Sequence, residues 1–359
     1  MAHFVVRPQW IVESEDGARL PPILFPLLEA IQATEKLTAA SRLVGVSYRH
    51  AWNLIEECHR FFGVPLVTLQ RGQGAQLTAL GEKLVWAERR TRARLGPHIE
   101  SLASEINLEL SRLISSSPAT LRIHASHGFA VAKLPELMNT EMHIQVDLRF
   151  MGSVEALASL QQRSCEFAGF HLAAGDLGSE LVDQYGPLIY SDAHRFIHLV
   201  RRVQGLYVAN GNPKGIHALT DVCREDVRMI NRQVGSGTRI LFDHLLQQAG
   251  LHCDDVQGYR SEEFTHAAVA AYVASGIADV GFGVEPPARQ FGLDFIPVAD
   301  ENYYLACEAQ TLKDPGGAKL HALLSGSVFR SAVRELPGYD ASLAGNVLSA
   351  AEIMRSLRR

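Results

Sequence analysis

Residues 37–63 read LTAASRLVGVSYRHAWNLIEECHRFFG. Apolar residues recur here at the spacing of amphipathic helices, on either side of a short break at Gly45. Thr38 and Ser47 each precede a helical block, where a hydroxyl can accept a backbone N–H of the first turn. Two helices joined by a short turn that contains glycine are typical of a helix-turn-helix, so this stretch predicts one.

The neighbouring residues extend the unit on both sides. Upstream, PILFPLLEAIQATE (22–35) predicts a third helix. Downstream, the run 64–77 predicts a hairpin with a glycine-containing tip, which would form a wing. A longer helix is predicted over about 79–113, capped by Thr78, and its apolar stripe favours a role in dimerisation.

The second helix of such a motif enters the major groove of DNA with its first turns toward the bases. The residues placed to read bases are therefore Tyr48, Arg49, His50 and Asn53. Arginine pairs with guanine, and asparagine pairs with adenine. The rest of the predicted DNA-binding set, expected near phosphates or the minor groove, is Thr38, Ser47, Arg71 and Gln73.

Charge supports this assignment. The chain has a formal net charge of -5, yet the segment from Lys36 to Arg94 holds ten Lys and Arg against four Glu, a balance of +6. A basic segment of this kind suits a polyanion such as double-stranded DNA, whereas the acidic remainder does not.

Composition bounds the class of protein. With 359 residues, the chain is long enough for two or three domains. Its hydrophobic fraction of 47% and charged fraction of 20% are typical of a soluble globular protein, and no apolar run is long enough for a spanning helix. The first twenty residues lack the apolar core of a secretory signal, so we expect a cytoplasmic protein. Five scattered cysteines favour neither disulfides nor a zinc site, and we expect no metal and no cofactor.

The stretch SSSPAT (115–120) marks a domain boundary. Beyond it, β-rich runs such as LRIHAS and HIQVDLRF alternate with helical blocks, which predicts an α/β domain with mainly parallel strands. The predicted domains are 1–78, a linker helix 79–118, and 119–359.

One turn in this half is suited to an anion. NRQVGSGTR (231–239) lies between a strand-like run and a helical block, so Gly235, Ser236, Gly237 and Thr238 would present amides and hydroxyls at a helix N-terminus. Arg232 and Arg239 are the candidate charge partners. A tight turn that needs glycine for backbone reasons alone is the competing interpretation.

Other strand ends can converge on the same place, because open α/β sheets bind ligands beyond the carboxyl ends of their strands. SHGFA (126–130) and MGS (151–153) are two such ends. His171 closes another strand, and Glu263 with His266 is expected to open a helix.

Two families resemble these halves. Through LTAASRLVGVSYRHAWNLIEECHRFFGVPLV and LTALGEKLV, residues 22 to about 90 resemble the winged helix-turn-helix of ModE-type molybdenum-responsive regulators, to which LysR-type regulators are related. Through ASHGF, INRQVGSGTR and THAAVAAYVASGIADVGFGVEPPARQFGLDFIPVADENYYL, most of 119–350 resembles the type 2 periplasmic-binding-protein fold.

The second resemblance implies two lobes, about 119–205 with 283–359 and about 206–282, that close on a small ligand. In that fold the ligand is held at helix N-termini, which implies a role for Ser126, His127, Gly152, Ser153, Ser236, Gly237, Thr238 and Tyr303.

The sequence thus predicts a transcriptional regulator, acting as a homodimer or a dimer of dimers, that binds operator DNA and senses a small anion. By resemblance the anion is molybdate or tungstate; the arginines and histidines suit a small carboxylate such as formate equally well. The alternatives are an enzyme, using Ser126 beside His127 or acting on a molybdenum cofactor, and a transport receptor. No catalytic motif supports an enzyme, and we expect no enzyme activity. A transport receptor would explain the second half of the chain, but it disagrees with the predicted DNA-binding half and with the lack of a secretory signal.

Overall fold

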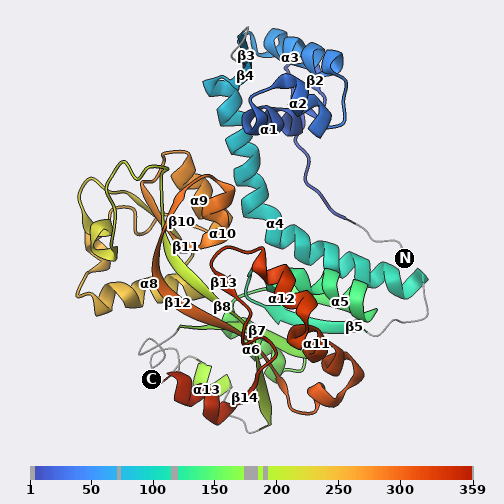
Figure 1. Ribbon diagram of the computed structural model, residues 1–359, viewed down its shortest axis with the longest axis vertical. Helices are drawn as coiled ribbons and strands as arrows, with labels where there is room; N and C mark the ends of the chain where they lie inside the picture. The colour runs from blue at the N-terminus through green and yellow to red at the C-terminus, as the bar shows by residue number, and fades with distance from the viewer. Residues whose placement is uncertain (1–4, 71–73, 115–119, 174–184, 189–192, 358–359) are drawn as a thin grey trace. The chain divides into compact units, whose positions relative to one another are not determined.

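The computed structural model describes residues 5–70, 74–114, 120–173, 185–188 and 193–357. By its internal contacts the chain divides into two compact units, one of residues Arg7–Ala93 and one of Met1–Val6 with Arg94–Arg359 (Figure 1). The predicted α/β fold class, a winged helix-turn-helix with a long helix followed by an α/β domain, is confirmed.

The smaller unit contains the predicted three helices and the wing. Its elements are β1 (Val12–Glu13), β2 (Arg19–Leu20), α1 (Leu24–Thr34), α2 (Leu37–Leu43), α3 (Tyr48–Phe62), β3 (Val67–Gln70) and β4 (Gly74–Leu77). β3 and β4 pair antiparallel as the wing. Arg71 and Gln73, predicted at its tip, lie outside the described residues.

The caps predicted for α2 and α3 have different outcomes. The Ser47 hydroxyl accepts a hydrogen bond from the His50 amide at 3.1 Å, so Ser47 caps α3. The prediction for Thr38 was wrong, because α2 begins one residue before it, at Leu37. Lys36 takes the extended backbone that precedes the helix, which leaves Thr38 inside the first turn. Gly45 lies between the two helices with φ of 74°, a left-handed conformation that favours glycine.

Helix α3 is held by one apolar face. Ala51, Leu54, Ile55 and Cys58 are buried against α1, α2 and the wing, in the core of this unit. The wing itself packs on the end of α1, where the Ala75 amide donates to the Glu35 carbonyl at 2.8 Å. These contacts hold the opposite face of α3 toward solvent.

The long helix α4 (Ala79–Ile114) has 36 residues, which corresponds to a length of roughly 54 Å. Thr78 caps it as predicted, accepting from the Gly81 amide at 3.3 Å. Beyond Ala93 the helix belongs to the larger unit, where it is bound to strand β6 (Gln145–Phe150). There Ser101 and Ser104 accept backbone N–H groups of Phe150 and Leu148 at 3.2 and 3.1 Å.

The larger unit is built on one mixed sheet with the strand order β10-β9-β11-β8-β12-β7-β5-β6. Besides β6, its strands are β5 (Thr120–Ala125), β7 (Phe167–Ala173), β8 (His194–Val208), β9 (Met229–Arg232), β10 (Glu262–Glu263), β11 (Val280–Val284), β12 (Asp294–Glu308), β13 (Tyr339–Asp340) and β14 (Val347–Ser349).

Helices cover this sheet. They are α5 (Leu134–Met142), α6 (Ser153–Gln161), α8 (Gly237–Gln248), α9 (His266–Ala274), α10 (Glu285–Gln290), α11 (Pro315–Ser325), α12 (Ser327–Arg334) and α13 (Ala350–Leu357), with short 3-10 turns at Val131–Lys133, Leu219–Cys223, Cys253–Asp255 and Thr311–Lys313. None of the described helices is long and apolar enough to cross a membrane.

The prediction of mainly parallel strands was wrong for the centre of the sheet. Strands β5, β6 and β7 are parallel, as are β9, β10 and β11. Between these two sets run β8 and β12, each 15 residues long and antiparallel to each other and to their outer neighbours (Figure 1). We call the β5–β7 side the first lobe and the β9–β11 side the second lobe; β8 and β12 pass through both.

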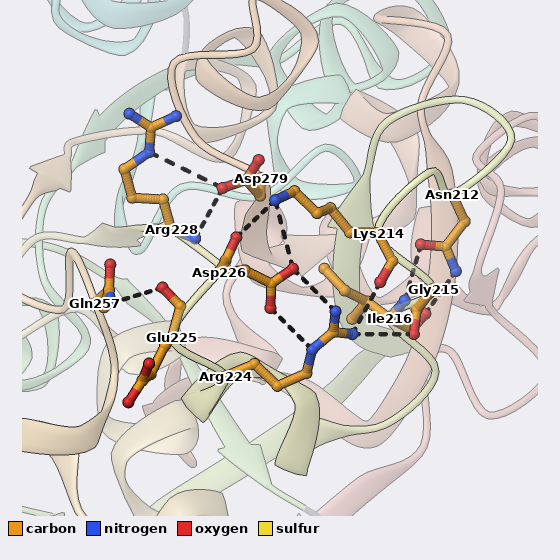
Figure 2. Close-up of polar contacts among 10 residues, drawn as sticks. All are labelled: Asn212, Lys214, Gly215, Ile216, Arg224, Glu225, Asp226, Arg228, Gln257 and Asp279. Atoms are coloured by element: carbon orange, nitrogen blue, oxygen red, sulfur yellow. Dashed lines mark hydrogen bonds and ion pairs between the residues drawn. The ribbon is translucent and has the colours of Figure 1, made fainter.

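A polar network on the second lobe ties its loops together (Figure 2). The Lys214 ammonium donates to the Asp226 carbonyl at 2.7 Å, and the Arg224 guanidinium donates to the Lys214 carbonyl at 2.8 Å and to the Asp226 carboxylate at 3.0 Å. Nearby, the amide of Arg228 donates to the Asp279 carboxylate at 2.9 Å. These side chains are between 20% and 58% exposed, so the network is a structural feature of the surface.

Candidate functional site

The solvent face of α3 carries the predicted base-reading residues. Tyr48, Arg49, His50 and Asn53 are all exposed. Helical geometry places Arg49 and Asn53 on the side opposite the buried Ala51 and Ile55, four residues apart and one above the other.

An aromatic pair flanks this face, formed by the predicted Tyr48 and by Trp52, which the sequence reading missed. Trp52 is 37% exposed and Tyr48 is 48% exposed, and their ring centroids are 6.3 Å apart. Large aromatic side chains at a helix surface without a covering element are unusual for a purely structural helix. Trp52 was not predicted as a DNA-binding residue, because its spacing from Ile55 and Leu54 also fits the buried apolar stripe of the helix.

In the larger unit, a second set of polar residues gathers where the strands of the first lobe end. The Ser126 hydroxyl, after β5, lies 2.8 Å from Nε2 of His171 on β7. The Tyr303 hydroxyl on β12 donates to the Ser126 carbonyl at 2.7 Å. Glycine is required at position 169, because a Cβ there would lie 2.4 Å from the Tyr303 hydroxyl.

The central strands add a buried ion pair. Arg202 on β8 donates through Nε to Oε2 of Glu301 on β12 at 2.7 Å, and its Nη2 lies 2.7 Å from the same oxygen in an ion pair. Its Nη2 also lies 3.2 Å from Nε2 of His171. Since a guanidinium only donates, His171 Nε2 accepts and the ring proton is on Nδ1. Arg202 is 1% exposed, and its charge is therefore matched by that of Glu301 inside the protein.

Strand β8 also links this pair to the second lobe. The Gln204 amide donates to Glu301 Oε2 at 2.8 Å and to the Thr238 hydroxyl at 3.3 Å. Thr238 is the second residue of α8, so the start of that helix is bound to the middle of the sheet.

The turn NRQVGSGTR forms the N-terminus of α8, as predicted. The Ser236 hydroxyl caps the helix by accepting from the Arg239 amide at 3.2 Å. Gly235 has φ of 81°, so backbone geometry alone accounts for that glycine. Gly237 has a different reason, because a Cβ there would lie 3.3 Å from Cδ2 of His171, across the two lobes. The first amides of α8 therefore face the cluster of the first lobe.

The two arginines of this turn have different environments. Arg239 is bound to Asp243, with Nε to Oδ1 at 2.9 Å, and its guanidinium stacks on the Tyr259 ring at 3.9 Å. Arg232 lies at the end of β9 and is 7% exposed. It donates to the side chain of Gln233 at 3.1 Å and to the Phe264 carbonyl at 3.0 Å.

Arg232 lacks a carboxylate partner within the described part of the chain, since its hydrogen bonds all go to neutral groups. Burial lowers the pKa of its guanidinium to about 10. The group stays charged near neutral pH. It is therefore a buried and uncompensated positive charge.

Three imidazoles surround the two buried arginines. Burial, followed by the charges of Arg232 and Arg202, lowers the pKa of His127 to about 3, although this residue keeps part of its surface exposed. Burial and the same two charges lower the pKa of His171 and of His266 well below the ordinary value of 6.5. All three rings are neutral, and the Nδ1 atom of each is buried without a hydrogen-bond partner among the described residues.

The remaining predicted residues lie around this cluster. Glu263 is on β10 rather than on a helix, so its predicted placement was wrong; β10 pairs with β9 and delays the start of α9 to His266. The Glu263 carboxylate lies 3.5 Å from Nε of Arg94 on α4. Gly152 and Ser153 begin α6, and no hydrogen bond or ion pair between described residues joins them to either buried arginine.

The sequence reading missed Arg202, Gln204 and Glu301. They lie on β8 and β12, the two long central strands, and no strand was predicted over these residues. A signal existed, because HRFIHLVRRVQGLYV (194–208) is a long β-rich run that holds charged residues within apolar ones.

Comparison with known families agrees with this geometry. The family described as "PBP superfamily domain" matches residues 134–325, more than half of the chain. The chain belongs to the PBP superfamily. The match covers the strands from β6 to β12 and the turn at α8, whereas β5 precedes it and β13 and β14 follow it.

Relatives of known name cover only part of the chain. The uncharacterized protein YvgK of Bacillus subtilis is 34% identical over 203 residues, which is 56% of this chain and 64% of that protein. The molybdenum-pterin-binding protein MopB of Rhodobacter capsulatus is 30% identical over 169 residues, 46% of this chain and 61% of that protein. The chain thus spans less than two thirds of each of these relatives.

Solved structures of LysR-family regulators superpose on most of the chain at low similarity. An OxyR mutant of Corynebacterium glutamicum has a TM-score of 0.44 and 13% identity, covering 88% of this chain and 95% of that chain. Full-length BenM has a TM-score of 0.44 and 14% identity, covering 87% and 96%. At these values the superposition adds no argument, and the architecture stands on the elements described above.

Proposed function

We propose that the protein is a DNA-binding transcriptional regulator whose PBP domain binds a small anion and thereby alters its affinity for operator DNA. The observation that carries the anion half is Arg232, a buried cation without a carboxylate partner among the described residues. Leaving a charge uncompensated inside a protein costs free energy, so such a group is expected where a ligand of opposite charge binds.

The DNA half is supported by the exposed face of α3. Arg49 and Asn53 have the side chains and spacing to contact two neighbouring bases, and Ser47 at the cap can contact a phosphate. The positive balance of the segment from Lys36 to Arg94 favours association with the phosphate backbone.

A homodimer is the proposed assembly. On α4, Leu95, Leu102 and Ile106 are exposed apolar side chains at the seven- and four-residue spacing of a helix–helix seam. A dimer would place two α3 helices on two half-sites. Leu102→Lys is expected to give a monomer by light scattering and to weaken DNA binding, whereas wild type would be a dimer or a dimer of dimers.

The anion is proposed to be molybdate, tungstate or a small carboxylate such as formate. MopB, whose name refers to molybdenum-pterin binding, matches part of this chain and supports the first two. The neutral donors around Arg232 suit any of these oxygen anions.

An enzyme is the alternative class, and one contact bears on it. The partner of the Ser126 hydroxyl is His171, not His127, and Nδ1 of His171 lies 3.9 Å from the Glu301 carboxylate. This resembles a nucleophile, a base and an orienting acid. However, Arg202 donates to the same Nε2, and the pKa of His171 is well below its ordinary value, so this ring is a poor base. We therefore propose that the protein has no enzyme activity.

The test has two arms. Double-stranded DNA selected from a random library with the purified protein would be measured by fluorescence anisotropy, with Arg49→Gln and Asn53→Ala as variants and Arg330→Gln, on α12 of the other unit, as the control. Melting temperatures with molybdate, tungstate and formate would be measured in parallel, because a ligand of the folded state raises the melting temperature. Unchanged DNA affinity in both α3 variants would contradict the DNA half, and no melting shift with any anion would contradict the anion half.

A further inference from the structure

We propose that Glu56 is a further base-reading residue of α3 and that it selects a cytosine in the operator. The proposal rests on the proposed function, because it applies only if α3 reads DNA. It assigns a role to an acidic side chain within a segment whose charge balance is otherwise positive. The partner that it names is a G·C base pair at a defined place in the operator.

Glu56 lies on the same face of α3 as the residues already assigned to the bases. A recognition helix in the major groove can contact bases from positions i, i+3, i+4 and i+7, which share one face. Counted from Arg49, these positions are Trp52, Asn53 and Glu56. All four side chains are exposed, and they lie opposite the buried apolar face of the helix.

The neighbouring glutamate, Glu57, faces another side of α3. Successive residues of an α-helix are about 100° apart around its axis. Glu56 is therefore within about 20° of the mean direction of Arg49, Trp52 and Asn53, whereas Glu57 is roughly 90° from it. Both glutamates are exposed, so the chain itself supplies a matched control.

The Glu56 carboxylate is available to DNA. Among the described residues, no hydrogen bond or ion pair holds this carboxylate. Arg60, one turn later, donates through Nε to the main-chain carbonyl of Glu56 at 3.4 Å rather than to its carboxylate. The arginine one turn along the helix therefore does not neutralise the side chain.

A carboxylate only accepts hydrogen bonds, and this decides which bases it favours. In the major groove, cytosine presents its N4 amine, which is a donor. Guanine presents N7 and O6 and thymine presents O4, all of which are acceptors. Adenine presents an N6 amine beside the acceptor N7. The expected order of preference at this position is cytosine, then adenine, with guanine and thymine last.

Glu56 also acts against sites that lack the amine. When α3 docks, the carboxylate loses water and comes near phosphates that repel it, so the contact with the amine has to offset both effects. Discrimination of this kind depends on repulsion as well as on attraction. Since contacts to phosphates carry no sequence information, Glu56 would add specificity where the basic residues add affinity.

The rise of the helix gives the expected position of this cytosine. Arg49 and Glu56 are seven residues apart, which is roughly 10 Å along the axis of α3. Base pairs are about 3.4 Å apart, so the two side chains reach base pairs that are about three steps apart. The selected DNA should therefore contain a guanine read by Arg49 and a G·C pair about three base pairs away.

The experiment changes one functional group in one selected site. The position read by Arg49 is first found as the one whose base preference is lost in Arg49→Gln. The cytosine about three base pairs away is then replaced by 2-pyrimidinone, which is cytosine without the N4 amine. We expect the affinity of the full-length wild-type protein, measured by fluorescence anisotropy, to fall about 5- to 150-fold, the usual effect of one mismatched base pair.

Two substitutions of Glu56 make the assignment specific. Glu56→Ala is expected to bind the cytosine and 2-pyrimidinone DNAs with nearly equal affinity, which separates the contact from any weakening of the base pair itself. The same variant should keep the base preferences at the positions read by Arg49 and Asn53. Glu56→Gln is expected to favour adenine at the cytosine position, because glutamine pairs with N6 and N7 of adenine.

Glu57→Gln is the charge-matched control. It removes the same negative charge from the adjoining residue, so it is expected to raise the affinity for every sequence alike. The preference for cytosine should remain as in wild type. Melting temperatures of all variants show whether each one is folded, and the exposed position of both glutamates favours folding.

Each outcome decides a different statement. A cytosine preference that survives in Glu56→Ala, or that is lost in Glu57→Gln instead, would overturn the role of Glu56. Selected DNA without a preferred G·C pair about three base pairs from the position read by Arg49 would overturn it as well. Absence of any selected DNA for the wild-type protein would contradict the DNA half of the proposed function itself.

Discussion

At the scale of single residues, the cluster depends on keeping imidazoles neutral beside arginines. A protonated His127 would bring a further positive charge near Arg232 and Arg202, and burial together with these two charges lowers the pKa of His127 to about 3. The free amino-acid side chain titrates near 6.5, so the unfolded chain takes up this proton at a higher pH. His127 therefore couples folding to pH.

The free energy of unfolding should decrease as the pH falls from about 7 toward 4, since the unfolded chain then binds more protons than the folded one. His127→Gln removes the imidazole that takes up a proton on unfolding. The substitution is therefore expected to make the melting temperature less dependent on pH between 7.5 and 5. Thermal melts of both proteins across this range check the prediction. His143→Gln, at an exposed helix end, is the matched control, and an unchanged slope in His127→Gln would contradict the account.

At the scale of elements, α3 is expected to read bases through more residues than Arg49 and Asn53. Trp52 is exposed beside them, with its ring tilted against that of Tyr48. Apolar side chains in the major groove contact the methyl group of thymine. Trp52→Ala is expected to weaken binding to the selected DNA about 5- to 100-fold, with the loss confined to sites that contain thymine at one position.

The comparison uses the same DNA with that thymine replaced by uracil, which removes only the methyl group. Wild type should lose affinity on this replacement. Trp52→Ala, which already lacks the contact with the methyl group, should bind the two DNAs with equal affinity. Equal losses for both proteins would show that Trp52 does not contact the methyl group. Glu57→Ala, at an exposed position one turn after Asn53 and on a different side of α3 from Trp52, serves as the control.

The elements also show what local sequence could and could not predict. The three helices, the wing and α4 follow from periodicity and capping, and the α8 turn follows from its glycines. β8 and β12 were missed because their polar residues interrupt the apolar pattern. Arg202 and Glu301 are 99 residues apart, and only the register of these two strands brings them together. Arg232 was predicted as a charge partner of the anion. Its lack of a carboxylate partner in the described structure could not be predicted, because it depends on which distant residues pack around it.

At the scale of the whole molecule, a chain of contacts within the larger unit leads from α4 to the cluster. Arg94, where this unit begins on α4, lies 3.5 Å from the Glu263 carboxylate, and its guanidinium is 5.7 Å from the centre of the Phe264 ring. The Phe264 carbonyl in turn accepts from Arg232. In the proposed function, an anion that binds Arg232 would therefore alter the contacts of Arg94 on α4.

Arg94→Gln is expected to leave tungstate affinity within about 3-fold of wild type, since the ion pair is partly exposed. It should reduce the effect of tungstate on DNA affinity, because coupling between two sites needs contacts that differ between the two states. Arg92→Gln on the same helix, whose carboxylate partners lie in the smaller unit, is the control. A full tungstate response in Arg94→Gln would exclude this route.

The measurement that tests the central claim most directly is the affinity of the wild-type protein for its selected DNA at one fixed salt concentration, with and without saturating tungstate. The account predicts a change of about 5- to 150-fold, which is the usual range of coupling between two sites, and no change for Arg232→Gln at the same tungstate concentration. Equal DNA affinity in the two conditions, with tungstate shown by calorimetry to be bound, would contradict it.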